Sequence, residues 1–163
     1  MAKGDIMPYE TAVGSKTVGS LRYLVASGTT ASINAGEPVQ KLAGAAKVTA
    51  MLNNSPTATN RVVGVAASTS NETASAVGTV DVIPATNGQL FLIAPKVAAS
   101  WNTQALYNAL IGARVLIDLT SGVYTLLAAD GAGNGCIVEY LDITRYPGMV
   151  AFSFSPLVDY RNV

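Results

Sequence analysis

Few side chains in this sequence could carry chemistry, and the carboxylates are the first to consider. Among the ten Asp and Glu residues, Glu139, Asp142 and Asp118 could supply the paired carboxylates of a glycoside hydrolase, in which one acid protonates the leaving group. Nothing in their spacing brings two of them to one cleft. A hydrolase that uses carboxylates alone is therefore the one enzyme class that the sequence leaves open.

Histidine is absent and cysteine occurs once. Without histidine the chain lacks the usual general base at neutral pH and an ordinary catalytic triad. A single cysteine cannot complete a zinc site built on nitrogen or sulfur ligands. Cys136 lies in an apolar run without a basic neighbour that would activate its thiol, so we expect a small core residue.

Loop motifs add no chemistry. Residues 130–135 resemble a calcium loop but lack the acidic ligands that follow in an EF-hand, so we expect a glycine-rich turn. No glycine-rich phosphate-binding loop occurs either. We therefore predict a non-enzymatic protein with no catalytic residues, no cofactor and no metal.

The composition describes a folded protein with little charge. Half of the 163 residues are hydrophobic and 12% are charged, and ten Lys or Arg balance ten Asp or Glu. No cluster of like charges marks a nucleic-acid or membrane surface, so we expect neither partner. Surfaces this low in charge are often covered by another protein, which favours assembly.

The N-terminal residues 1–20 show neither a helical nor a strand period, and we expect them to form an extended arm. Fully extended, such a segment spans about 65 Å. It lacks the apolar core of a signal peptide, and no run of about eighteen apolar residues follows, so we expect synthesis in the cytoplasm. The length suits one domain, residues 21–163, with an outer subdomain at about 95–163 as an alternative.

Short apolar runs bounded by Gly, Asn or Ser begin at Leu21 and predict strands. They cover residues 21–26, 37–42, 47–51, 61–67, 78–84, 89–93, 113–119, 122–127, 135–141 and 149–154. Residues 78–84 alternate between apolar and polar, and Asn87-Gly88 after them predicts a hairpin with residues 89–93. One strand about every ten residues indicates a mainly β domain, a compact sandwich or barrel.

Residues 100–111 predict one short helix. Ser100 or Asn102 could cap its start, and Gly112 is placed to end it. We expect its buried side to carry Trp101, Ala105 and Leu106, with Trp101 as a core anchor rather than a ligand platform.

The order of several segments carries a family resemblance. Residues 35–39 read Ala-Gly-Glu-Pro-Val, and residues 62–67 read Val-Val-Gly-Val-Ala-Ala before a polar loop, with Gly64 suited to a bulge or a close backbone approach. A valine-rich strand and residues 88–91, Gly-Gln-Leu-Phe, follow. This order resembles the head-decoration, or capsid cement, proteins of tailed bacteriophages.

The resemblance implies a barrel-like (β-tulip-like) fold on the outer face of a virion, bound to the major capsid protein as a trimer or other small homo-oligomer. It implies that the arm contacts the capsid and that its apolar side chains make the contact. These are Ile6, Met7, Pro8, Tyr9, Val13 and Val18.

Two other functions remain open on the residues. One is another virion component, such as a tail or knob protein. The other is a carbohydrate-binding β-module, although sugar-binding sites usually present exposed aromatic rings, and Trp101, Tyr107 and Tyr124 lie in apolar periodic runs.

Overall fold

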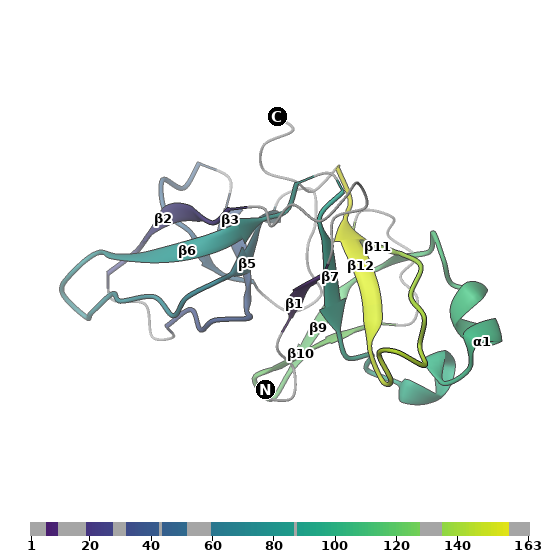
Figure 1. Cartoon of the computed structure of the whole chain (residues 1–163). Coiled ribbons are helices and arrows are strands. Elements are labelled where there is room, and N and C mark those ends of the chain that lie inside the picture. Colours follow the sequence, from purple (N-terminus) through teal and green to yellow (C-terminus); the bar gives the residue numbers. More distant parts are fainter. Residues whose placement is uncertain are drawn as a thin grey trace.

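The computed structural model describes residues 6–9, 19–27, 32–42, 44–51, 60–86, 88–127 and 135–156. This part of the chain is mainly β, with antiparallel sheets and one short α-helix. Figure 1 shows two β lobes side by side, the first built on β2–β6 and the second on β7–β12. The predicted barrel-like β fold is therefore confirmed.

The bounds of the elements follow the chain. They are β1 (Met7–Tyr9), β2 (Leu21–Val25), β3 (Pro38–Leu42), β4 (Thr49–Ala50), β5 (Asn60–Ala66), β6 (Gly78–Pro84), β7 (Leu90–Ile93), the 3-10 helix η1 (Ala98–Trp101), α1 (Gln104–Asn108), β8 (Arg114–Val115), β9 (Ile117–Thr120), β10 (Val123–Leu126), β11 (Cys136–Val138) and β12 (Val150–Phe154).

The first lobe is one curled sheet in the order β2-β6-β5-β3-β4. Its two ends approach each other through a parallel bridge between Val25 and Val48, where the Val48 N–H donates to the Leu24 carbonyl at 2.9 Å. The enclosed side chains are almost all β-branched, which suits a pleated, buried surface. They are Val25, Ile33, Val39, Val48, Val63, Ala66, Val80 and Val82.

Strand β5 serves both lobes and carries a bulge at Gly64. Val39 of β3 lies opposite Gly64, whereas the next residue, Gln40, lies opposite Val62, so the register skips one position. Because successive side chains of a strand point to opposite faces, Val63 points into the first lobe, while Val62 packs in the core of the second. Burial on both faces explains the continuous apolar run, and the prediction of a bulge or close approach at Gly64 is confirmed.

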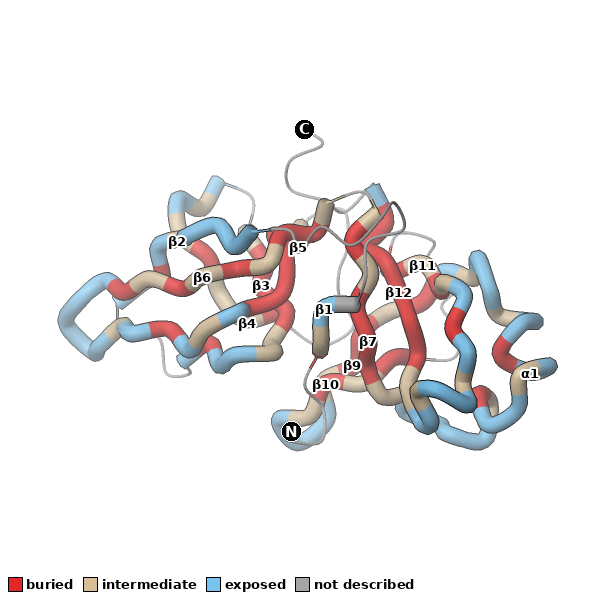
Figure 2. Tube along the Cα trace, in the orientation of Figure 1, coloured by how far each residue is buried: buried red, intermediate tan, exposed pale blue. Residues whose placement is uncertain are grey.

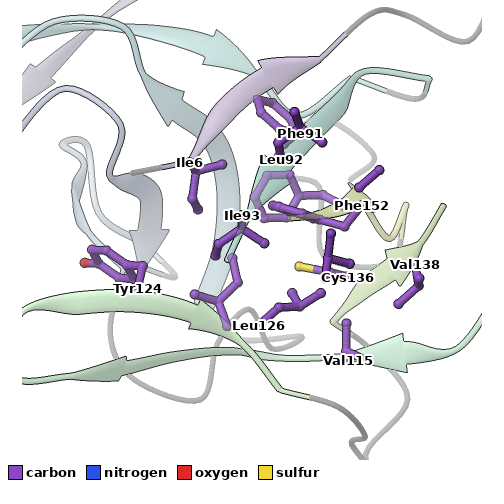
Figure 3. Close-up of a cluster of buried hydrophobic side chains, with 14 of the residues drawn as sticks. Ile6, Phe91, Leu92, Ile93, Val115, Tyr124, Leu126, Cys136, Val138 and Phe152 are labelled. Carbon is purple, nitrogen blue, oxygen red and sulfur yellow. The ribbon is translucent and has the colours of Figure 1, made fainter. Parts of the chain in front are cut away.

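The second lobe is a five-stranded sheet in the order β1-β7-β12-β11-β8, followed by the hairpin β9–β10. Strand β8 runs on into β9, and β10 returns to the residues after β7. There the Lys96 N–H donates to the Leu126 carbonyl at 2.8 Å, and the Leu126 N–H donates to the Ala94 carbonyl at 3.0 Å. The wall thus curls around an apolar core, part of which Figure 3 shows.

Aromatic rings fill the middle of this second core. The rings of Phe91, Phe152 and Phe154 contact one another, with centroids 5.2 to 5.8 Å apart. All five residues of β12 are buried. Cys136 lies in the same core, as the sequence predicts.

The N-terminal segment joins the two lobes. Strand β1 pairs antiparallel with β7 of the second lobe, with Met7 opposite Leu92. Immediately before it, the Ile6 N–H donates to the Gly36 carbonyl of the first lobe at 3.0 Å. Residues 6–9 are therefore part of the chain's own sheet rather than a free arm, and the rest of the predicted arm up to residue 18 lies outside the described residues.

The predicted helix over residues 100–111 is wrong in its extent. The segment forms η1 and then the five-residue α1, which begins after Thr103, whose hydroxyl accepts from the Leu106 N–H at 3.3 Å. Leu106 is 47% exposed, whereas Tyr107 is fully buried and packs edge-on against Trp101. The two aromatic rings, rather than Ala105 and Leu106, attach this segment to the lobe.

The predicted hairpin at Asn87-Gly88 is also wrong. A turn is present, since the Gln89 N–H donates to the Thr86 carbonyl at 2.9 Å and Gly88 has a φ of +88°. However, β6 already pairs with β2 on one side and β5 on the other, so no edge remains for β7. The turn instead carries the chain from the first lobe to the second.

Candidate assembly surface

The buried carboxylate Asp118 is held by a cation and a hydroxyl. Its side chain is 6% exposed and accepts from Lys96 Nζ at 2.8 Å and from Thr120 Oγ1 at 2.7 Å. The hydrogen bond from Lys96, followed by that from Thr120, holds the pKa of Asp118 below its usual range. This ion pair ties the segment that follows β7 to β9, which is a structural role.

The two other carboxylates considered for hydrolysis are also engaged locally. Glu139 Oε1 accepts from Ser153 Oγ at 2.6 Å. Asp142 Oδ1 accepts from the Thr144 hydroxyl at 2.6 Å and from its N–H at 2.9 Å, and these bonds lower the pKa of Asp142. In the part of the chain that the structure describes, no group of three or more acidic or cysteine side chains lies together as a metal site would require.

The aromatic residues that could have formed a sugar platform are buried. Tyr107 Oη donates to the Glu139 carbonyl at 2.8 Å and accepts from the Ala151 N–H at 2.9 Å. Trp101 is 4% exposed, so its predicted role as a core anchor is confirmed. These rings cannot stack on a ligand without unfolding of the lobe.

Tyr124 makes a contact between the lobes. Its hydroxyl donates to the Met51 carbonyl at 2.9 Å, and burial raises the pKa of Tyr124 well above its ordinary value. Figure 3 shows the ring on β10 with its oxygen directed away from Leu126 and Ile93.

The predicted capsid contacts in the arm lie in different environments. Ile6 is 2% exposed and belongs to the core of the second lobe, so the prediction of a surface contact is wrong for this residue because the chain itself covers it. Met7 is half-buried against the same core, and Pro8 is exposed. For Tyr9 the structure gives only its position opposite Leu90. Val13 and Val18 lie outside the described residues.

The second lobe exposes a set of large apolar side chains at its outer end, around α1. We call them the outer apolar surface: Val97, Leu106, Ile111 and Tyr140, which are 42% to 62% exposed. Figures 1 and 2 show α1 and its exposed neighbours on the side away from the first lobe. Val97, Leu106 and Ile111 lie within residues 97–113, which contain no Asp, Glu, Lys or Arg. Tyr140 lies outside this stretch, between Glu139 and the exposed Asp142.

Hydrogen bonds hold this surface in shape. Gln104 Nε2 donates to the Leu141 carbonyl at 3.0 Å, while the Ile143 N–H donates to Gln104 Oε1 at 3.2 Å. The Gly112 N–H donates to the Val138 carbonyl at 2.8 Å. Residues 138–143 and the segment around α1 therefore lie side by side, although they are far apart in sequence.

The first lobe also exposes large apolar side chains, namely Leu21, Leu24 and Val77. Leu24 lies opposite Thr79 on the β2–β6 pair, and Val77 is two residues before Thr79. The next pair along the same face is charged, with Arg22 donating to both carboxylate oxygens of Asp81 at 2.8 and 3.2 Å. An ion pair beside the leucine makes this face more polar than the outer apolar surface.

Sequence reasoning missed the outer apolar surface because it assigned Leu106 to the buried side of a longer helix. The signal that could have found it is the absence of charge over residues 97–113. Comparison of the chain with protein-family models, with curated proteins and with solved structures gave no match. None of the described helices is long and apolar enough to cross a membrane.

Proposed function

We propose that this chain is a non-enzymatic structural protein of a phage virion that binds the outer face of the capsid and stabilises the shell. The observation that carries the proposal is the outer apolar surface. Four large apolar side chains stay exposed at this end of the lobe, three of them on a segment without charge, and exposed apolar patches often mark sites of protein contact. The resemblance to head-decoration proteins gives the identity of the partner.

The arrangement of the second lobe supports a rigid docking surface. The buried rings of Trp101 and Tyr107 anchor the segment to the lobe, while the Gln104 carboxamide bonds to Leu141 and Ile143 of the neighbouring loop. Side chains held on a preformed backbone lose less entropy when they bind. A neutral protein with such a surface can associate with another protein without strong electrostatic steering.

Oligomerisation would raise the avidity of these contacts. A trimer or other small homo-oligomer that engages several capsid subunits at once turns each further contact into an intramolecular one. We expect Pro8 and the exposed edge of β1 to add to the contact, since Ile6 is committed to the core. The major capsid protein is the proposed partner.

Co-sedimentation with empty shells of the phage that encodes the chain tests the proposal. The wild-type chain should pellet with the shells, and the double variant Leu106→Asp/Ile111→Asp should stay in the supernatant. Leu24→Asp is the matched control, because Leu24 is as exposed as Leu106 but lies on the first lobe. Failure of the wild-type chain to pellet at any concentration would contradict the proposal.

A further inference from the structure

The seam between the lobes is mainly apolar on the side of the first lobe, and Gln40 is a polar residue buried in it. The first-lobe residues that pack in the second-lobe core are Met51, Val62, Val65, Ile83 and Ala85. Gln40 of β3 lies opposite Val62 in β5 and opposite Thr49 in β4. Because paired residues point to the same face of a sheet, the carboxamide of Gln40 points into this seam.

Gln40 is fully buried, and neither its Nε2 nor its Oε1 has a hydrogen-bond partner. Most buried side-chain polar atoms in proteins are paired, because an amide that leaves water without a partner loses its hydrogen bonds outright. The orphan carboxamide therefore disfavours the closed seam and favours any state in which water reaches Gln40.

Hydrogen bonds between the lobes help to hold the seam closed against this penalty. Among the described residues, the Tyr124 hydroxyl bonds to the Met51 carbonyl, and the Ile6 N–H bonds to the Gly36 carbonyl. Both bonds join one lobe to the other. Within each lobe, by contrast, backbone hydrogen bonds between paired strands hold the sheets together.

We infer that the two lobes open along this seam as folded units, and that Gln40 is the residue that keeps the open state accessible. Opening would hydrate the carboxamide, break the bonds of Ile6 and Tyr124, and uncover Met51 and Val62. The turn at Gly88, which links the lobes, is a position where backbone rotation is cheap.

A buried water is the competing explanation for Gln40. A water in a protein interior needs two to four polar partners. In strand pairing, Gln40 lies opposite Val62 on one side and Thr49 on the other. A crystal structure of the wild-type chain with an ordered water bonded to both Nε2 and Oε1 of Gln40 would overturn the inference.

Amide hydrogen exchange on the full chain gives the direct test. The Ile6 amide reports on the seam, while the Val48 and Gly112 amides report on the interiors of the first and second lobes. In the wild-type chain the Ile6 amide should exchange at least tenfold faster, relative to its intrinsic rate, than the two interior amides. Its rate should also depend less on urea, because seam opening exposes less surface than unfolding.

The variant Gln40→Met separates seam opening from fraying of the N-terminal strand. Replacing the orphan amide by an apolar side chain of similar volume should slow Ile6 exchange about tenfold and leave exchange at Val48 and Gly112 unchanged. Gln89→Met is the matched control, because Gln89 is also buried but its Nε2 donates to the Leu90 carbonyl at 2.8 Å. It should not slow Ile6 exchange.

Unchanged Ile6 exchange in Gln40→Met, or equal slowing at all three amides, would overturn the inference. If Gln40→Met does not fold, the inference is tested with Gln40→Leu and with the wild-type exchange rates of Ile6, Val48 and Gly112. Neither result bears on shell binding, so this test is independent of the proposed function.

Discussion

Replacing Gly64 with alanine should destabilise the whole molecule, because this residue lies where two strands come closest. A Cβ atom at position 64 would lie 1.9 Å from the Ile83 carbonyl oxygen and 2.8 Å from Val82 Cγ1. The first of these is a backbone atom in a paired strand, so it cannot move aside as the end of a flexible side chain can. The φ of +152° adds a backbone conformation that side chains disfavour.

The expected magnitude combines two costs. Backbone strain at a disfavoured φ costs roughly 1–3 kcal/mol, and overpacking of a dense interior costs roughly 1–3 kcal/mol more. A loss of about 2–6 kcal/mol is a large share of the roughly 5–15 kcal/mol that stabilises a typical domain. Gly64→Ala should therefore unfold at much lower urea concentration than the wild-type chain.

Two other glycines separate these costs. At Gly148, φ is +74° but nothing lies within 4 Å of the added Cβ, so Gly148→Ala measures the backbone cost alone. At Gly135, a Cβ would meet the Val115 carbonyl oxygen at 2.0 Å, so Gly135→Ala measures the steric cost without a positive φ. Urea denaturation followed by circular dichroism gives all three values. Equal stability of Gly64→Ala and Gly148→Ala would refute the argument that close packing at β5 supports both lobes.

Three further predictions concern single side chains. Tyr124→Phe leaves the buried Met51 carbonyl without its partner and should cost roughly 1–3 kcal/mol in urea denaturation; no loss would show that this bond does not stabilise the closed seam. Asp118→Asn should destabilise the chain at neutral pH. Because the pKa of Asp118 is lowered in the folded state, the difference in stability from wild type should be fully present above pH ~4, the ordinary Asp pKa. It should shrink as the pH falls through the folded-state pKa. A pH-independent difference in thermal unfolding would contradict this. Thr103→Ala removes the cap of α1 and should cost about 1 kcal/mol, with faster exchange of the Leu106 amide; unchanged exchange would argue against the cap.

The strands were predictable from sequence because each one is a short apolar run with turn-forming residues at its ends. Residues 78–84 form β6 with alternating burial, as their pattern predicts. The turn at Ser121 and Gly122, both at positive φ, closes the β9–β10 hairpin in the predicted place. These features depend on neighbours in sequence, and sequence patterns describe such neighbours well.

The pairing of the strands was not predictable in the same way. The Asn87-Gly88 turn satisfies the local rule for a hairpin, yet β2 and β5, from distant parts of the sequence, occupy both edges of β6. Similarly, the run in β5 indicates burial, but only the fold shows that one lobe covers the face of Val62 and another the face of Val63. Such cases depend on which distant strands pair with each edge of a strand and which elements cover each face of a sheet.

The candidate surface was the least predictable part. Leu106 fits an apolar helical stripe, and only the burial of Trp101 and Tyr107 shows that these rings take the inward positions. Residues 1–20 were expected to form an extended arm with Ile6 on its surface, whereas Ile6 is buried in the core of the second lobe, which no local pattern could reveal. The burial of Cys136 was predicted correctly because its apolar neighbours in sequence sufficed.

Heating of DNA-filled shells with and without the chain tests the central claim most directly. A protein that binds the intact shell, and not its ruptured form, shifts the equilibrium toward the intact shell. At saturating chain, release of DNA to a fluorescent dye should therefore begin at a temperature several degrees higher than for bare shells, and Leu106→Asp/Ile111→Asp should abolish the shift. The same release temperature with and without saturating wild-type chain would contradict a shell-stabilising role.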